Sequence, residues 1–228
     1  MDYLEDKKLL ELRFSNGMMI LPFVRYKLLC SKNQDNTSSS SRNPVSKPTI
    51  FFRLFSNLIR IRVKKKKLVF FSSTLFNVEV EGEKGIYYNS MDGYYYDLFP
   101  EDSLLIEDAD EEFKWRAKNS YKSMSFIRTY LLFLSFTLSR VFNKIKPIRR
   151  IDFDYIIKNY PELYTIEELG RLDYFHRIYY SLIKWVLKKT QCNLIAVNCG
   201  SYGETYAPLI KAAHDLGIKV IEMQHGAI

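Results

Sequence analysis

The sequence predicts an α/β fold with a parallel sheet and flanking helices. The most informative part is 193–224, where an apolar run, a glycine-containing loop, a helical pattern and a second apolar run follow one another. Strand, helix and strand in so short a stretch form a βαβ unit, whose strands are parallel and joined by a right-handed crossover. Two earlier apolar runs, at 68–73 and 104–107, can extend the same sheet. The composition, 47% hydrophobic and 26% charged over 228 residues, is typical of a folded globular chain.

The first 49 residues divide into two parts. Residues 1–30 predict a short helix, a turn at Asn16-Gly17 and an apolar stretch that ends PFVRYKLL. The next stretch, SKNQDNTSSSSRNPVSKP, has no apolar periodicity and is rich in Ser, Asn and Pro, which is typical of a flexible loop. We therefore expect an N-terminal segment at 1–30, a loop at 31–49 and a single α/β domain at 50–228.

The first strands are expected after this loop. Alternating apolar and basic residues at 50–63 lead into four lysines and then into LVFFSS, whose length and apolar character indicate a short buried strand. At 86–99, aromatic runs flank Asp92-Gly93, a pair that favours tight turns, so we expect a β-hairpin there. LLIE at 104–107 predicts another short strand.

Two long helices are expected in the middle of the chain. The first covers about 120–146 and ends before Pro147, which cannot continue a helix. The second begins near Thr165, because Thr165 and Glu168 have the spacing of a capping box, and Gly170 is a candidate break in it. Beyond that glycine, a stripe at helical spacing predicts the side that faces the core: Leu172, Phe175, Tyr179, Leu182, Val186 and Leu187.

The C-terminal βαβ unit follows this helix. NLIAVNC at 193–199 has the length and composition of a buried strand, and IKVIEMQ at 218–224 is expected to form a second strand. ETYAPLIKAAHDL at 204–216 has helical periodicity, and Gly217 suits the left-handed position that often ends a helix. The expected inner side of this helix is Ala207, Ile210, Ala213 and Leu216.

Charge is segregated along the chain, which carries 34 Lys and Arg against 26 Asp and Glu, a net charge of +8. Two basic stretches, 53–67 and 114–150, contain no acidic residue, and the acidic stretch 79–112 between them contains one Lys. Solvated faces would explain this pattern. If the basic stretches share one face, the apolar and aromatic residues among them suit an anionic membrane surface. No nucleic-acid-binding motif accompanies the lysine run, so we expect no nucleic acid as a partner.

The cysteines and apolar runs indicate a cytoplasmic protein. Cys30, Cys192 and Cys199 have no metal-ligand spacing and are too few for a secreted disulfide scaffold. The acidic N-terminus is unlike that of a signal peptide. In the most apolar run, the uncharged stretch between Arg128 and Arg140 is well short of the roughly 20 residues that span a bilayer. Any membrane contact would therefore be peripheral, on the inner face of the plasma membrane.

Two loops follow the carboxyl ends of the last two predicted strands, where open parallel sheets bind ligands. The first leads into a helix N-terminus, which favours an anion such as phosphate, and consists of Gly200, Ser201, Tyr202 and Gly203. The second consists of Gln224, His225 and Gly226. The His225 imidazole can act as a general base or donate a hydrogen bond to a phosphate or hydroxyl. Glu222 is expected on the strand face of Gln224, and a buried carboxylate there needs a partner. A tight βα turn and a structural histidine remain the alternatives.

The ending GSYGETYAPLIKAAHDLGIKVIEMQHGAI resembles the first-domain core of GT-B-type glycosyltransferases that build bacterial capsule and lipopolysaccharide. The likeness centres on a strand that ends in E-x-Q-H-G-x-I, and a more distant likeness is to the CDP-glycerol glycerophosphotransferases. Asn16-Gly17 followed by LPFVRYKL resembles a G…W-P-x-x-R stretch of these proteins, with Leu21 in place of the usual Trp. MDGYYYDLFPEDSLLIED resembles their hairpin and following strand.

The resemblance implies a Rossmann-like, acceptor-binding first domain in which Gln224, His225 and Gly226 face an interdomain cleft. His225 would be the catalytic or phosphate-contacting residue, and Glu222 matches the motif with a less defined role. The family transfers a sugar from a nucleotide-sugar, as substrate, to a glycan or lipid-linked acceptor, with no metal or cofactor implied. Its second domain, which holds most of the nucleotide-sugar, has no counterpart before Ile228, so we expect no transferase activity from this chain alone.

Two other functions fit the same pattern. Sugar-nucleotide epimerases share the two-domain GT-B fold, and they act on the donor without an acceptor. A non-catalytic α/β module that binds a partner or a membrane would also explain the absence of a second domain, the polar loop at 31–49 and Leu21.

Overall fold

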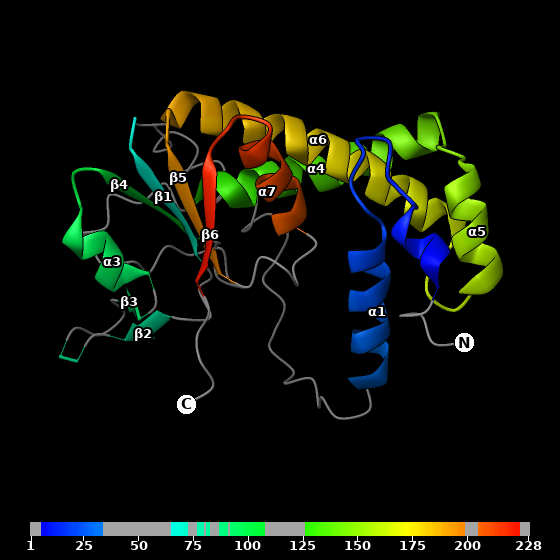
Figure 1. The fold of residues 1–228 in the computed structure, drawn as a ribbon, viewed down its shortest axis with the longest axis horizontal. Coiled ribbons are helices and arrows are strands. Elements are labelled where there is room, and N and C mark those ends of the chain that lie inside the picture. The colour runs from blue at the N-terminus through cyan, green and yellow to red at the C-terminus, as the bar shows by residue number, and fades with distance from the viewer. Residues whose placement is uncertain are drawn as a thin grey trace, which may run out of the picture.

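The computed structural model describes residues 6–33, 65–72, 77–79, 81–82, 87–90, 92–107, 126–198 and 205–223. Within these residues, four strands form one sheet in the order β4-β1-β5-β6, and every neighbouring pair is parallel (Figure 1). The strands are β1 (Leu68–Ser72), β4 (Ser103–Glu107), β5 (Leu194–Asn198) and β6 (Lys219–Met223). All four were expected from the sequence, within a residue or two at their ends. The architecture is a Rossmann-like α/β arrangement.

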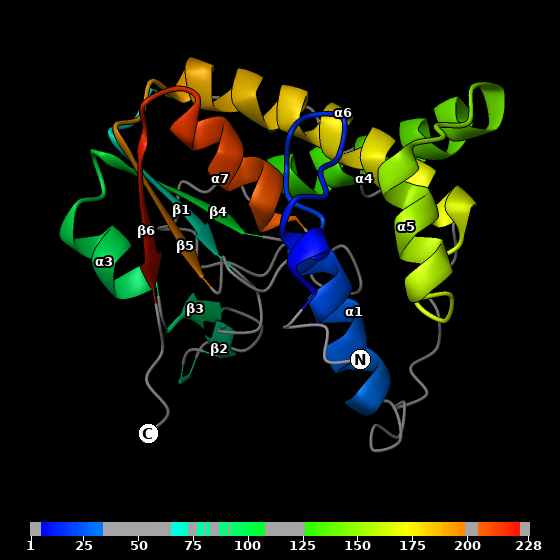
Figure 2. The same ribbon diagram turned by 45° about the vertical axis from the view of Figure 1, so that its right-hand side comes forward.

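Helices cover both faces of this sheet. The side chains of a strand alternate between its faces, so Val69 and Phe71 of β1 point to one side and Phe70 to the other. The short helix α3 (Gly93–Leu98) packs Tyr96 against Phe70 on one face. The other face is covered by α4 (Phe126–Ile145), α6 (Ile166–Thr190) and α7 (Tyr206–His214) (Figure 2). Because both faces are buried, the central strands are continuous apolar runs.

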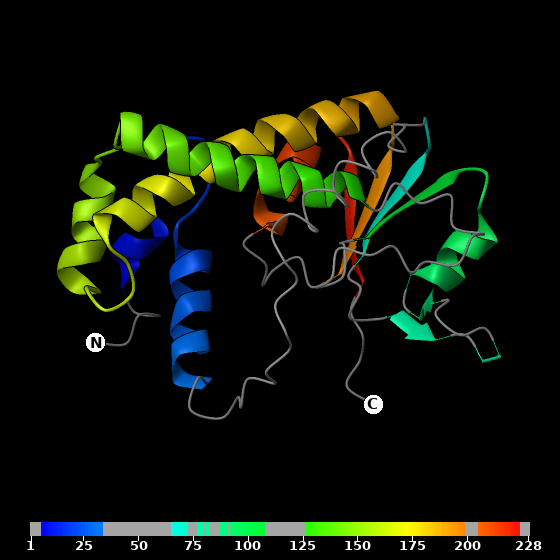
Figure 3. The same ribbon diagram turned by 180° about the vertical axis from the view of Figure 1, so that it is seen from behind.

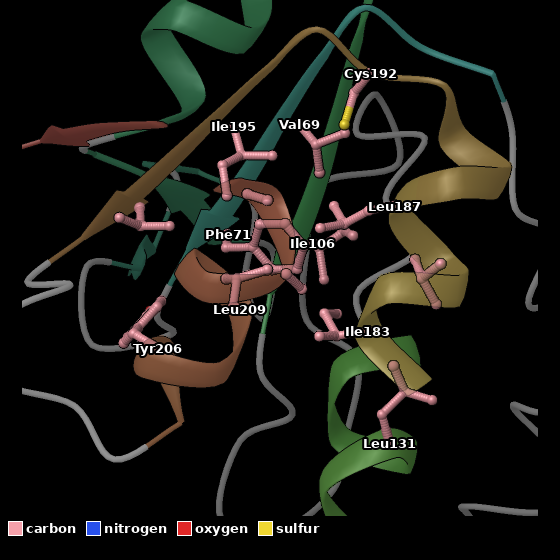
Figure 4. Packing of buried hydrophobic residues seen from close by; sticks show 14 of the residues in the cluster. Val69, Phe71, Ile106, Leu131, Ile183, Leu187, Cys192, Ile195, Tyr206 and Leu209 are labelled. Carbon is pink, nitrogen blue, oxygen red and sulfur yellow. The ribbon is translucent and has the colours of Figure 1, made fainter. Parts of the chain in front are cut away.

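The larger core lies between the sheet and α4, α6 and α7. Figure 4 shows Phe71 and Ile195 of the sheet pointing toward Leu209 of α7 and Ile183 of α6. These four side chains are fully buried. Tight packing of apolar side chains from two strands and two helices fixes the position of the strand ends that border the candidate site. We call this part of the molecule, with its covering helices, the sheet region.

A second core joins the N-terminal residues to α5 (Ile151–Asn159) and the start of α6. A 3₁₀ helix (Lys7–Leu10) and a tight turn precede α1 (Leu21–Asn33), and Gly17 in that turn has φ +81°, a left-handed conformation that glycine adopts readily. Phe14 contacts the rings of Phe23, at 5.3 Å between centroids, and Phe153, at 6.3 Å. Residues 6–33, α5 and the start of α6 are called the N-terminal region below.

Helices α4 and α6 run side by side (Figure 3), and α6 continues from the N-terminal region into the sheet region. The predicted capping box begins α6: the Thr165 hydroxyl accepts from the Glu168 N–H, and the Glu168 carboxylate accepts from the Thr165 N–H at 2.8 Å. The candidate break at Gly170 is absent, because α6 is continuous from Ile166 to Thr190. A Cβ on Gly170 would stand 2.5 Å from Asn143 Oδ1, so this glycine allows α4 to approach α6 closely.

Three sequence-based expectations need correction. The expected hairpin at 86–99 is replaced by β3 (Tyr87–Asn89), which pairs antiparallel with β2 (Asn77–Glu79), and by α3, because Asp92-Gly93 begins a helix instead of a turn. Helix α5 was not predicted. On α7 the buried residues are Tyr206, Pro208, Leu209, Ala212 and Ala213, so the inner side is rotated from the predicted one, and Ala213 belongs to both sets.

The expected boundary after residue 30 falls inside a helix, since α1 continues to Asn33. The rest of the polar loop and the alternating stretch at 50–63 lie outside the described residues. None of the helices that the structure describes is both long enough and apolar enough to cross a membrane.

Candidate functional site

The order of the strands marks one edge of the sheet as the candidate site. From β1 the chain moves outward to β4 past α3 on one face, and from β5 it moves the other way to β6 through α7 on the opposite face. The direction therefore reverses between β1 and β5, and this is the topological switch point of the sheet. Ligands of open α/β sheets bind beyond the carboxyl ends of the strands at such a point. Here those ends are Ser72 of β1 and Asn198 of β5.

Ser72, Asn198 and Asp92 form a buried polar cluster at this point. Ser72 and Asn198 share the strand face of Phe70 and Ala196, the face that α3 covers, and Asp92 is the residue immediately before α3. The Asn198 amide donates to Asp92 Oδ2 at 2.7 Å and to Ser72 Oγ at 3.5 Å. All three residues are at most 2% exposed. Within the described part of the chain, Asn198 Oδ1 is buried without a hydrogen-bond partner.

Burial raises the pKa of the Asp92 carboxyl above its ordinary value, and hydrogen bonds from Ser72 and Asn198 offset this only in part. The cause is desolvation, which disfavours the charged form of a carboxyl group. Buried carboxyl groups with a raised pKa are common at functional sites, because they can hold or release a proton near neutral pH. The Asp92 side chain makes no capping hydrogen bond to α3. Its carboxyl instead accepts a hydrogen bond from Asn198 at the end of β5.

A buried arginine lies on the opposite face, at the start of α7. Arg128 near the beginning of α4 is 2% exposed, and its guanidinium donates to Thr205 Oγ1 at 2.8 Å and to Tyr206 Oη at 3.1 Å. The guanidinium carbon is 4.3 Å from the centroid of the Tyr206 ring. Helix N-termini carry partial positive charge, so Arg128 adds to an existing electropositive end. This arrangement favours an anionic group beyond β5.

The structure describes only one of the predicted site residues. Glu222 lies on β6 opposite Val197 of β5 and is exposed, so solvent can stabilise its charge and no buried partner is required. The other predicted positions lie outside the described residues and stay predictions: Gly200, Ser201, Tyr202, Gly203, Gln224, His225 and Gly226. The strands that precede them are parallel neighbours ending at Asn198 and Met223, as the sequence predicts.

The remaining histidines and the described cysteine have structural positions. His214 is exposed on α7. His176 is fully buried between the rings of Phe14, at 4.9 Å between centroids, and Phe23, at 4.5 Å. Burial raises the pKa of the Cys192 thiol, which packs in the larger core. Among the described residues, no three His, Cys, Asp or Glu side chains gather as metal ligands would.

Sequence reasoning missed most of the polar groups at this edge. Ser72 and Asn198 could have been recognised as polar residues that end apolar strands at a switch point. Asp92 was assigned to a turn, and nothing in its local sequence links it to Asn198, which is 106 residues away. Arg128 was counted only among the basic residues of 114–150, which were expected on a solvated or membrane-facing surface, although it is buried. Comparison with protein-family models, curated proteins and solved structures finds no match to this chain.

Proposed function

We propose that this chain is the acceptor-side domain of a GT-B-type glycosyltransferase that acts in bacterial surface-polysaccharide synthesis. The observation that carries the proposal is the position of the motif E-x-Q-H-G-x-I. It begins at Glu222 inside β6, and its Gln, His and Gly directly follow Met223, the last residue of that strand. Strand β6 is the parallel neighbour of β5, which ends at the switch point. Residues in this position border the ligand-binding edge of an open sheet.

The proposed reaction moves a sugar from a nucleotide-sugar to a glycan or lipid-linked acceptor. His225 would take the proton of the attacking acceptor hydroxyl or contact the donor phosphate, both of which suit an imidazole near neutral pH. Asp92 would act as a positioning residue, since it holds Asn198 directly before the loop that contains Gly200 and Gly203. Arg128 and the N-terminus of α7 supply positive charge for an anionic group of the acceptor or donor. The nucleotide-sugar domain of such an enzyme would be a separate unit.

Binding to the chain itself tests this proposal. Ligand-observed NMR can measure saturable binding of nucleotide-sugars and of oligosaccharides from surface polysaccharides. We expect at least one glycan to bind, and His225→Ala to weaken it about tenfold, which corresponds to about 1.4 kcal/mol. His214→Ala is the matched control, because His214 is exposed on α7 and away from both loops in sequence.

The outcomes separate the alternatives. The absence of saturable binding to any glycan or nucleotide-sugar would contradict the proposal, as would equal effects of the two histidine variants. Conversion of a nucleotide-sugar to its epimer without acceptor would favour a sugar-nucleotide epimerase. Sugar transfer measured after adding a nucleotide-sugar domain, with and without His225→Ala, then tests the assigned role of the imidazole.

A further inference from the structure

Helix α4 exposes more large apolar side chains than an ordinary surface helix does. Surface helices turn an apolar stripe toward the core and polar residues toward water. On α4, the side packed on α6 carries Ser135, Ser139 and Asn143, all buried. Six large apolar side chains of this helix are nevertheless exposed: Phe133, Leu134, Phe136, Val141, Phe142 and Ile145. Two of them, Phe136 and Phe142, also contact rings of α6.

The inner side of α4 carries buried Ile127 and Leu131 near its start and polar residues along the rest of its length. Ser135, Ser139 and Asn143 are spaced four residues apart and therefore form one stripe. The hydroxyl of Ser135 donates to the carbonyl of Leu131 at 2.6 Å, and Asn143 Nδ2 donates to the carbonyl of Glu167 at 3.1 Å. Small residues on this stripe, with Gly170 opposite, let the two helices approach closely. Close helix packing therefore explains the inward position of these polar residues, while Leu134, Val141 and Ile145 remain exposed.

The outer apolar side is continuous along the helix. Leu134, Val141 and Ile145 are spaced by seven and four residues, so they lie on one side of the helix. Ile145 is 75% exposed, and Ile151, just beyond the helix end, is 86% exposed. In Figure 3, no described helix or strand lies in front of α4. An exposed apolar surface of this kind marks a site of interaction with a partner or a membrane.

The charge beside this apolar surface of α4 indicates which kind of partner it binds. The outer side also carries exposed basic residues, Arg140 and Lys144 on the helix and Lys146 and Arg149 after it. The sequence contains no acidic residue from 114 to 150. A second copy of the chain would bring these like charges together with no carboxylate on this helix to pair with them. Basic and apolar side chains on one helix instead match an anionic lipid surface, where the apolar side enters the headgroup boundary.

We propose that α4 docks this chain in the plane of an anionic lipid bilayer, with Leu134, Val141 and Ile145 inserted and Arg140 and Lys144 bound to lipid headgroups. The helix lies along the surface, in agreement with the finding that no described helix can span a membrane. This docking does not depend on glycosyltransferase activity, because it uses one side of α4 and no residue of the candidate site. Vesicle binding and glycan binding are measured separately, so either proposal can fail alone.

Co-sedimentation with phospholipid vesicles tests the docking. We expect binding to vesicles with 30% phosphatidylglycerol, weaker binding to pure phosphatidylcholine, and loss of binding in high salt. Arg140→Glu with Lys144→Glu is expected to weaken binding about 30-fold or more, because each basic residue near an anionic surface contributes about 1 kcal/mol. Lys188→Glu with Lys189→Glu, exposed on α6, gives the same change of net charge and is expected to have little effect.

A second pair of variants tests the apolar contribution to vesicle binding. Val141→Ser with Ile145→Ser is expected to weaken vesicle binding at least tenfold. Leu98→Ser with Phe99→Ser removes two comparably exposed apolar side chains at α3 and is expected to leave binding unchanged. All eight substitutions are at exposed positions, and circular dichroism checks the fold. Amide exchange of the unmodified chain gives a second measurement: vesicles are expected to protect peptides from 133–149.

Three results would overturn the proposal. In the first, the charge variants of α4 and their controls on α6 lose vesicle binding equally, which would show that net charge alone determines the binding. In the second, neutral and anionic vesicles bind equally well in high salt. In the third, light scattering shows a dimer that Val141→Ser with Ile145→Ser converts to a monomer, while vesicles do not bind. That last result would assign the apolar side to a second copy of the chain.

Discussion

The sheet region and the N-terminal region are built in different ways. In the sheet region, the central strands β1 and β5 are short continuous apolar runs such as Val69–Phe71, and both of their faces are buried. In the N-terminal region, one core is assembled from pieces far apart in the sequence, for example Phe14 with Phe153. The comparison shows that burial on two faces leaves a pattern in the sequence, whereas assembly from short distant pieces leaves much less.

Their buried carboxyl groups differ as well. Asp6 in the N-terminal region accepts hydrogen bonds from the hydroxyls of Tyr155 and Tyr160, both at 2.8 Å, and from the N–H of Lys8 at 3.0 Å. Burial raises the pKa of Asp6, but these donors together outweigh it, so the pKa is lowered. Asp92 in the sheet region has a raised pKa. A carboxylate whose hydrogen bonds outweigh the cost of burial, as at Asp6, stabilises the fold. A carboxyl group whose charged form is still disfavoured by burial, as at Asp92, is typical of a functional site.

The largest expected effect tests whether the two regions unfold together. Phe71→Ala and Phe14→Ala each remove a buried phenyl ring, and each is expected to cost about 3–5 kcal/mol. Because α6 contributes to both cores, we expect a single cooperative transition that both variants shift to lower denaturant concentration. Chemical denaturation followed by circular dichroism measures this. A separate early transition in Phe14→Ala would show that the N-terminal region is an independent unit.

A smaller effect is expected where α4 crosses α6. Gly170→Ala places a Cβ 2.5 Å from Asn143 Oδ1 and 3.3 Å from the carbonyl oxygen of Ile148, so α4 or the Asn143 side chain must shift. We expect a loss of about 1–3 kcal/mol in the free energy of unfolding. Gly170→Ala combined with Asn143→Ala removes the closest atom, and thermal denaturation should show partial recovery. Equal losses in the single and double variants would point to the backbone contact with Ile148 instead.

The next prediction concerns His176, where α6 meets the N-terminal region. Burial lowers the pKa of this imidazole to about 3, and both ring nitrogens lack a hydrogen-bond partner within the described residues. Below about pH 6.5 the unfolded chain takes up a proton on this imidazole and the folded chain does not. The free energy of unfolding therefore decreases as the pH is lowered below that value. We expect a loss of about 2 kcal/mol between pH 8 and pH 5. His176→Phe should lack this component when both chains are unfolded with urea over the same pH range.

Asp92 gives the opposite sign in the sheet region. Its raised pKa means that the folded chain binds a proton more readily than the unfolded chain. The stabilising contribution is therefore complete below the unfolded pKa, near 3.8, and is lost as the pH rises through the folded value. Relative to Asp92→Asn, the unmodified chain should become less stable with rising pH. An Asn variant that is less stable at every pH by the same amount would show that Asp92 is a purely structural residue.

Much of the sheet region follows from the sequence. LVFFS and LIAVN predicted β1 and β5, and the glycine after α7 has the expected left-handed φ of +69°. Strand alternation also places Ser72 and Asn198 on one face at the switch point. The hairpin at Asp92-Gly93 was wrong, because a turn pair and a helix start share the same residue preferences. Helix α5 was missed because its apolar residues pack on Phe14 and Leu9, far away in the sequence.

By itself, the sequence determined the parallel βαβ unit and the capping box of α6. These features depend on spacing within a few residues, which a single chain displays directly. Tertiary structure alone decided that Asp92 lies beside Asn198, that Arg128 is buried against Tyr206, and that α4 leaves a row of apolar side chains exposed. Each of these depends on contacts between residues far apart in the sequence. Such packing can outweigh the conformation that a helix or turn would prefer from its own residues.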